Sequence, residues 1–161
     1  MTVVVIFRCG DRRCALERAS VGEVAPVPEL TQPPGMSANI AGFFSLAGDA
    51  MPVVDAAALF GVASDPNIDP IYRHILIVGS GDERLGLLVD RVEDVRRIDL
   101  STMVATPDEY TLNDCVAGEV TINDAPVAIL IPDRILLAAE KARLVNLRVA
   151  EQARLDALAP T

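Results

Sequence analysis

The chain has 161 residues, of which 51% are hydrophobic and 23% charged, a size and composition typical of one compact domain. Its 23 acidic and 14 basic residues give a net charge of -9, which disfavours nucleic acid and anionic lipid as partners. Aromatic residues make up 4% of the chain and tryptophan is absent, so the stacking platforms of single-strand nucleic-acid binders are missing as well.

The features of the sequence that bear on location favour the cytoplasm. No apolar run reaches the roughly 18 residues that cross a bilayer, and the stretch Met1–Phe7 lacks the basic start and cleavage site of a signal peptide. The three cysteines, Cys9, Cys14 and Cys115, form no C-x-x-C motif and leave an odd thiol under any pairing. This usage fits a reducing compartment, so we expect a cytoplasmic protein with buried, reduced thiols.

Short apolar runs separated by turn residues fill most of the chain and predict strands. Val3–Cys9 and Arg13–Glu17 flank a Gly-Asp turn and predict a hairpin, which Ala19–Val24 follows as a short helical turn. The stretch Ala25–Gly35 contains four of the eleven prolines, which exclude a helix interior or a central strand. We therefore expect a loop there.

A second hairpin and a short helix come next. Ile40–Leu46 and Met51–Val54 predict the two strands, and Asp55 with Gly61 predicts a two-turn helix with an aspartate N-cap and a C-terminal glycine. The polar, proline-bearing link at 64–70 is the predicted crossing between two subdomains.

The second half continues the pattern of strands and turns. Strands are predicted at Arg73–Val78, Arg84 to about Ile98, Val116–Ile122 and Pro126–Ile131. The segments 48–55 and 123–133 share one order of features, which is a turn, a proline-led strand, an aspartate cap and a helix. This single repeat indicates two halves of similar topology.

The C-terminal region predicts a helix over about 133–159, because Arg134–Ala159 contains neither glycine nor proline and is rich in helix formers. Five leucines share one face, but Glu140, Arg148 and Glu151 interrupt that stripe. We expect the first turns to pack on the body. The later turns either form a solvated tail or bind another protein.

Side chains that could carry chemistry are sparse. His74 is the one histidine and starts an apolar strand, so a structural role is expected. Asp90 and Asp94 share one face of the long predicted strand and could hold Mg²⁺ in a small hydrolase, although solvated edge carboxylates are the simpler interpretation. The turn Gly79-Ser80-Gly81 lacks the third glycine and the following helix of a dinucleotide site. We therefore expect no enzymatic activity, no cofactor and no metal.

Four blocks of sequence occur in a recognisable order. They are Val21–Val24, Ile40–Gly48 leading into Pro52–Asp55, Gly86–Val92, and Val116–Gly118 with Val127–Leu130. In this order they resemble the CheW-like family of chemotaxis coupling proteins, from about Val4 to Leu137. The resemblance implies a mainly β fold over residues 1–161, in which two intertwined, SH3-like, five-stranded β-barrel subdomains pack together with a C-terminal α-helix.

The resemblance also implies a function, that of a non-enzymatic adaptor or scaffold in bacterial chemotaxis signal transduction. Such an adaptor couples chemoreceptors to a CheA-type histidine kinase. The barrel ends would dock on the regulatory domain of the kinase, and a groove between the barrels would take the cytoplasmic tip of the receptor. The residues that the resemblance places at these contacts are Val21, Glu23, Ile40, Gly42, Leu46, Ala47, Gly48, Gly86, Val89, Asp90 and Val92.

One departure from the family pattern bears on the partner. The strand that usually ends Asn-Leu-Arg-Gly ends here as Ser45-Leu46-Ala47-Gly48. An arginine offers a fork of five donors suited to a carboxylate, and alanine offers none. An adaptor of a different chemosensory-type system, such as one for surface motility or development, with a different partner, is therefore the alternative.

Overall fold

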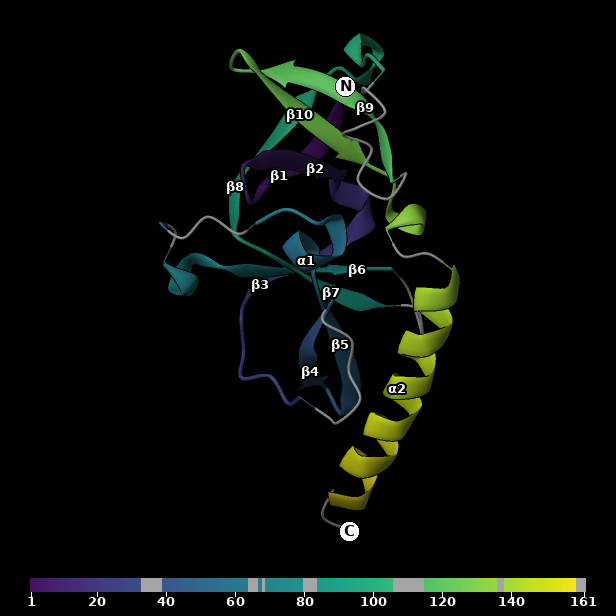
Figure 1. Ribbon diagram of the computed structural model, residues 1–161. Helices are drawn as coiled ribbons and strands as arrows, with labels where there is room; N and C mark the ends of the chain where they lie inside the picture. Colours follow the sequence, from purple (N-terminus) through teal and green to yellow (C-terminus); the bar gives the residue numbers. More distant parts are fainter. Residues whose placement is uncertain are drawn as a thin grey trace.

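The computed structural model describes residues 1–32, 39–63, 67, 69–79, 84–105, 115–135 and 138–158. Its strands form two five-stranded sheets, and a long helix runs beside the second of them (Figure 1). The expected mainly β fold with two five-stranded halves and a C-terminal helix is confirmed. Within the described residues the strand orders are open, with no ladder joining the two edge strands of either sheet.

The first sheet contains both the N-terminal hairpin and the last strands of the chain. Its order is β8-β1-β2-β10-β9, with bounds β1 Thr2–Cys9, β2 Arg12–Glu17, β8 Arg91–Ile98, β9 Val116–Ile122 and β10 Ala125–Leu130. The second sheet is built from the intervening strands. Its order is β3-β6-β7-β5-β4, with bounds β3 Val21–Pro26, β4 Ile40–Leu46, β5 Asp49–Asp55, β6 His74–Val78 and β7 Leu85–Val89.

The two sheets have the same topology, as the repeat in the sequence indicated. A central hairpin, β1–β2 in one sheet and β6–β7 in the other, pairs in parallel with an edge hairpin through β2–β10 and β7–β5. The edge hairpins are β9–β10 and β4–β5. The remaining edge strand of each sheet follows directly from the central hairpin of the other, since β3 follows β2 and β8 follows β7. The halves are therefore intertwined.

These crossings correct two predictions. The chain leaves the first sheet through the 3-10 turn η1 (Arg18–Ser20) and returns to it at Asp90. The link 64–70 is not a crossing, because the strands on either side of it, β5 and β6, belong to one sheet. The long strand predicted from Arg84 to Ile98 is divided at Asp90 into β7 and β8. The local pattern hides this break, because apolar residues continue on both sides of it.

The core joins the two sheets. Its largest cluster includes Phe7 and Leu16 of the first sheet, Phe43 and Leu87 of the second, and Leu144 of the helix α2. Two smaller clusters belong to one sheet each and contain residues such as Ile6 and Val127 in the first and Met51 and Ile75 in the second. Burial of apolar area contributes about 25 cal/mol per Å², so the shared cluster stabilises the sheets against each other as well as individually.

The short helices follow the predicted capping rules in one case and depart from them in another. Helix α1 (Ala56–Phe60) begins after Asp55, whose carboxylate accepts from the amides of Ala57 and Ala58, and ends at Gly61 in the left-handed conformation. The 3-10 turns η2 (Pro70–Tyr72) and η4 (Leu100–Thr102) lie in connections. Asp133, expected to be a helix cap, lies inside the turn η6 (Pro132–Arg134), whose N-cap position is Ile131.

Helix α2 (Ala138–Leu158) packs on the body between Leu144 and Leu155, which excludes a solvated tail over that part, whereas Asp156, Ala157 and Leu158 are exposed. It lies along β5 of the second sheet (Figure 1). Leu144 is buried against the shared core, and Leu147 and Leu155 pack on it at helical spacing. Glu151, which interrupts the leucine stripe, is itself buried and lies 3.7 Å from the guanidinium of Arg154. The packed face therefore tolerates one carboxylate near its centre.

Candidate protein-interaction surfaces

The residues predicted to make protein contacts fall into two groups. The structure buries Val21, Ile40, Gly42, Gly86, Val89 and Asp90. Leu46 and Val92 are half-buried, whereas Glu23, Ala47 and Gly48 are exposed. The buried apolar members form core, so their side chains cannot reach a partner while the sheets stay packed. The exposed members lie on two separate parts of the second sheet, the edge strand β3 and the turn of the β4–β5 hairpin.

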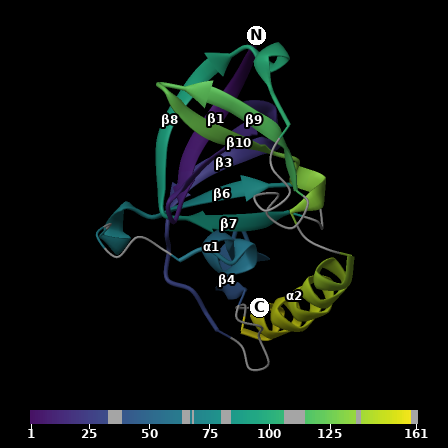
Figure 2. The ribbon, with the colours of Figure 1, turned by 45° about the horizontal axis from the view of Figure 1, so that its top comes forward.

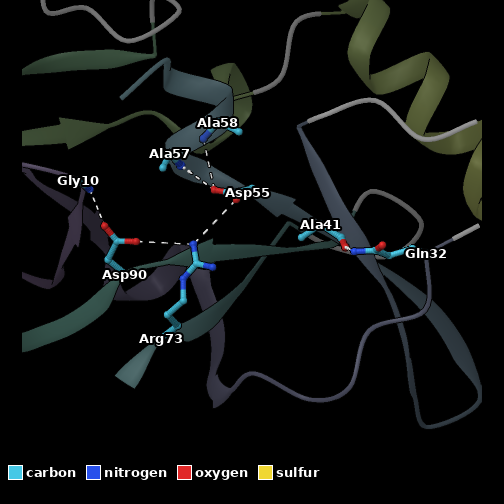
Figure 3. A network of polar contacts seen from close by, with 8 residues as sticks. All are labelled: Gly10, Gln32, Ala41, Asp55, Ala57, Ala58, Arg73 and Asp90. Carbon is cyan, nitrogen blue, oxygen red and sulfur yellow. Dashed lines mark hydrogen bonds and ion pairs between the residues drawn. The ribbon is translucent and has the colours of Figure 1, made fainter. Parts of the chain in front are cut away.

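Asp90 is the centre of a polar network between the two sheets (Figure 3). Its carboxylate accepts from the amide of Gly10 at 2.7 Å and lies 3.6 Å from the guanidinium of Arg73. Arg73 also lies 3.9 Å from the carboxylate of Asp55, which caps α1. The network thus connects the turn of the β1–β2 hairpin, the start of β6 and the first turn of α1. A buried charge needs such partners, so this carboxylate has a structural role at the crossing.

This geometry does not support a magnesium-dependent hydrolase. Asp94 lies beyond the break in the predicted strand and is exposed on β8, where its carboxylate accepts from the amide of Val95. It therefore does not converge with Asp90. Among the residues that the structure describes, no group of three His, Cys, Asp or Glu side chains is arranged to hold a metal ion. His74 accepts from the amide of Val92 at 3.5 Å through Nδ1, which fits the structural role expected for it.

The cysteines are buried free thiols, as expected. Burial is the main cause that raises the pKa of Cys14 to about 12; Arg12 opposes this shift and the neighbouring Cys115 adds to it. Burial, followed by the neighbouring Cys14, also raises the pKa of Cys9 far above its ordinary value. The thiolate is the reactive and metal-binding form, so both residues are unreactive at neutral pH.

The exposed edge of the second sheet carries an apolar surface that the sequence alone did not single out. Val24 on β3 is exposed, and Ile71 and Tyr72 are 78% and 59% exposed. The turn η2 presents these two side chains, and it is held by Asp69, whose carboxylate accepts from the amide of Ile71 at 3.0 Å. Tyr72 is two residues before His74, the first residue of β6, and His74 pairs with Pro26 of β3. Ile71 and Tyr72 therefore lie in the connection that leads into β6, beyond the Pro26 end of β3, whereas Glu23 pairs with Ile77 near the other end of that strand.

A signal for this surface is present in the sequence, although it is weak. Asp69-Pro70 is a turn-initiating pair, and two large apolar residues follow it directly. Single exposed apolar residues are common on protein surfaces, so this pattern gains meaning only when β3 is known to be the neighbouring edge. We use the name β3-edge surface for the exposed residues Glu23 and Val24 of β3 together with Ile71 and Tyr72, which come before the neighbouring strand β6.

The second exposed group lies at the turn of the β4–β5 hairpin. Ala47 has a positive φ of 53°, and its neighbour Gly48 is open to solvent on the side where a Cβ would lie. The side chain of Gln152 on α2 closes the hairpin end by donating to the carbonyl of Gly48 at 3.0 Å and accepting from the amide of Ala50 at 2.7 Å. This turn is therefore fixed against the C-terminal helix.

Gly42 differs from Gly48 because it has a packing role. Its φ is 153°, and a Cβ there would lie 2.8 Å from the Cβ of Leu30 and 2.9 Å from the carbonyl oxygen of Thr31. Thr31 and Phe43 exchange two backbone hydrogen bonds of 2.8 Å at the same place. Gly42 thus lets the segment after β3 lie against β4. This packing explains why position 42 is a glycine, without any contact to a partner protein.

Comparison with known proteins decides the family. The model of the CheW-like domain matches residues 3–140. The chain belongs to this family. It is 31% identical over 106 residues to the chemotaxis protein CheW of Rhizobium meliloti, an alignment that covers 65% of this chain and 66% of that protein. The chemotaxis protein CheA of Treponema pallidum is 26% identical over 90 residues, which are 55% of this chain and 10% of that protein.

A solved structure has the same framework. The scaffolding protein TtCheW of Thermoanaerobacter tengcongensis superposes with a TM-score of 0.73 at 26% identity, over 80% of this chain and 83% of that one. The family resemblance seen in the four sequence blocks is confirmed by these matches. In the described part of the chain, none of the helices has the length and apolar character needed to cross a membrane.

Proposed function

We propose that this chain is a non-enzymatic adaptor that couples chemoreceptors to a CheA-type histidine kinase in bacterial chemotaxis signalling, and that it acts in the cytoplasm. The observation that carries the proposal is the superposition of the two-sheet framework on a scaffolding protein of the CheW-like family. The polar network around Asp90 fits this proposal, because its contacts with Gly10 and Arg73 give that buried carboxylate a packing role.

The regulatory domain of the kinase is the first proposed partner. A stretch of the protein named CheA resembles this chain, which supports a kinase domain of related fold on the other side of the interface. The β3-edge surface supplies what such an interface needs. Its exposed aromatic and branched side chains can form an apolar centre, and Glu23 can set register and steer association.

The cytoplasmic tip of a chemoreceptor is the second proposed partner. The turn Leu46-Ala47-Gly48 is the place where the family resemblance puts a receptor contact, and the Gln152 hydrogen bonds hold its backbone in one conformation. Ala47 offers no side-chain donor there, so backbone groups and shape have to supply this contact. A fixed turn reduces the entropy lost on binding.

The test is a calorimetric titration of the full chain with the regulatory domain of a CheA-type kinase from the same organism. We expect micromolar binding. Tyr72→Ala should weaken it about tenfold, since truncating a central aromatic contact typically costs more than 1 kcal/mol. Val149→Ala is the matched control, because Val149 is 65% exposed on α2, away from the β3-edge surface. Variants at Ile40 or Val89 are unsuitable because both residues are buried.

The outcomes separate the proposals. Equal affinity of the Tyr72→Ala and Val149→Ala variants would exclude the β3-edge surface while keeping the kinase as partner. A folded chain that binds no such kinase would contradict the adaptor function in this form. It would favour the alternative of a CheW-like adaptor in a different chemosensory-type system.

A further inference from the structure

Three arginines form a row across adjacent strands of the first sheet, although the chain as a whole is strongly acidic. Arg8 on β1 pairs directly with Arg13 on β2 and with Arg91 on β8. Directly paired residues of neighbouring strands project from the same face, so the three side chains are neighbours. Figure 2 shows the first sheet, to which these three strands belong, from a tilted direction. We call Arg8, Arg13 and Arg91 the arginine row.

The row contains more positive charge than its surroundings compensate. Like charges placed directly opposite each other in a sheet are destabilising, and the row contains two such pairs. A β-bulge in β8 leaves Glu93 without a paired residue on β1, and its carboxylate lies 3.5 Å from Nε of Arg8 and 3.8 Å from Nε of Arg13. Arg91 makes no ion pair with the described residues. One carboxylate therefore lies beside two of the three guanidinium groups and leaves the third without an ion pair among the described residues.

The row lies at the end of the core of the first sheet. Arg8 follows Ile6 on the same face of β1, and Arg13 precedes Ala15 on the same face of β2, and both apolar residues belong to that core. The Nε atoms of Arg8 and Arg13 are shielded from solvent and make no hydrogen bond, while the side chains as wholes are 40% and 20% exposed. Arg13 also donates from one terminal nitrogen to the carbonyl of Ile122 at 3.4 Å. The stems are thus fixed by packing, and the outer part of the row is open to a ligand.

We propose that the arginine row binds carboxylate side chains of an acidic segment on a partner protein. A guanidinium presents its donors in a planar fork that matches a carboxylate, and stems fixed by packing lose little freedom on binding. Two strand spacings, about 10 Å in all, separate the outer members, which accommodates two or three side chains of a peptide. A nucleic acid fits poorly, because the net charge of -9 repels a long polyanion. The proposal is independent of the adaptor function.

The experiment is an NMR titration of the full ¹⁵N-labelled chain, which follows the Nε–Hε signals of its arginines. The probe is a triglutamate peptide with blocked ends, and a triglutamine peptide at the same ionic strength is its control. The signals of Arg8 and Arg13 should shift with triglutamate and stay unchanged with triglutamine. Arg91→Glu should weaken binding about fivefold or more, because it replaces an attraction at the row by a repulsion.

Arg97→Glu is the matched control variant, since Arg97 is exposed on the same strand but pairs with Val3 at its far end. It changes the net charge equally and should leave affinity within about twofold, because salt screens charges beyond about 8 Å. Equal weakening in both variants would overturn the proposal, as would a stronger response to inorganic phosphate than to triglutamate. If Arg91→Glu fails to fold, Arg91→Gln takes its place and should weaken binding in the same direction.

Discussion

At the scale of single residues, Asp90 shows how a charge can define the point where a chain changes sheets. Asp90 as a whole is only 3% exposed. Its carboxylate accepts a hydrogen bond from the amide of Gly10 and forms an ion pair with the guanidinium of Arg73. Its own amide donates to the carbonyl of Arg8 at 3.0 Å. Removal of the carboxylate would leave the amide of Gly10 buried without its acceptor and Arg73 with Asp55 as its more distant partner.

Asp90→Ala should therefore destabilise the fold by about 2–3 kcal/mol, the range for losing a charged hydrogen bond and leaving a buried group unpaired. The measurement is the free energy of unfolding from urea denaturation. Asp94→Ala is the matched control, because Asp94 is exposed on the adjoining strand, and it should stay within about 0.5 kcal/mol of the parent. A loss below 0.5 kcal/mol in Asp90→Ala would contradict the structural role of this carboxylate.

The residues predicted to make protein contacts illustrate what sequence can and cannot predict about a candidate site. Val21, Ile40 and Val89 belong to blocks that the family resemblance identified, yet whether each side chain points into the core or toward a partner depends on which strand lies next to it. Strand neighbours are distant in sequence, so local pattern cannot decide the question. The exposed Ile71 and Tyr72 were missed for the same reason.

At the scale of elements, the turn signals of the hairpins were reliable, whereas the helical turn predicted over Ala19–Val24 was wrong, because Val21–Pro26 forms the strand β3. The hairpins β1–β2, β4–β5 and β9–β10 lie where turn residues predicted them, because a tight turn depends on a few adjacent residues. The division of β7 from β8 was missed, since a buried aspartate resembles a solvated one in sequence. The packing of α2 was left open because Glu151 interrupts its leucine stripe, and only the position of the helix beside the second sheet shows that this carboxylate is buried.

Gln152 is the residue through which α2 is fixed to the second sheet. Gln152→Ala removes its bonds to the carbonyl of Gly48 and the amide of Ala50, so we expect a loss of about 1 kcal/mol, because a partly exposed hydrogen bond contributes about 0.5–1.5 kcal/mol. The readout is hydrogen exchange of the Ala50 amide, which should accelerate. Asn146→Ala, at an exposed site on the same helix, is the control and should leave that amide unchanged. Equal exchange rates of Ala50 in both variants would show that α2 does not hold the turn.

At the scale of the whole molecule, the exchanged edge strands make each sheet depend on the other. β3 completes the second sheet but is continuous with the central hairpin of the first, and β8 has the reverse relation. The largest core cluster also draws side chains from both sheets and from α2. Neither half can open without detaching an edge strand of the other and exposing shared apolar surface. The two sheets should therefore unfold as one cooperative unit.

Two conservative core variants test this cooperativity, Ile6→Val in the first sheet and Ile75→Val in the second. Both residues are fully buried and belong to clusters confined to one sheet, so each change removes one methylene and should cost about 0.5–1.5 kcal/mol. The measurement is the opening free energy of the slowest-exchanging amides in β1 and in β6. If the sheets unfold together, either variant lowers this free energy by the same amount in both strands. A decrease confined to the sheet that carries the substitution would mean that the halves open independently, and the intertwined edge strands would then not couple them.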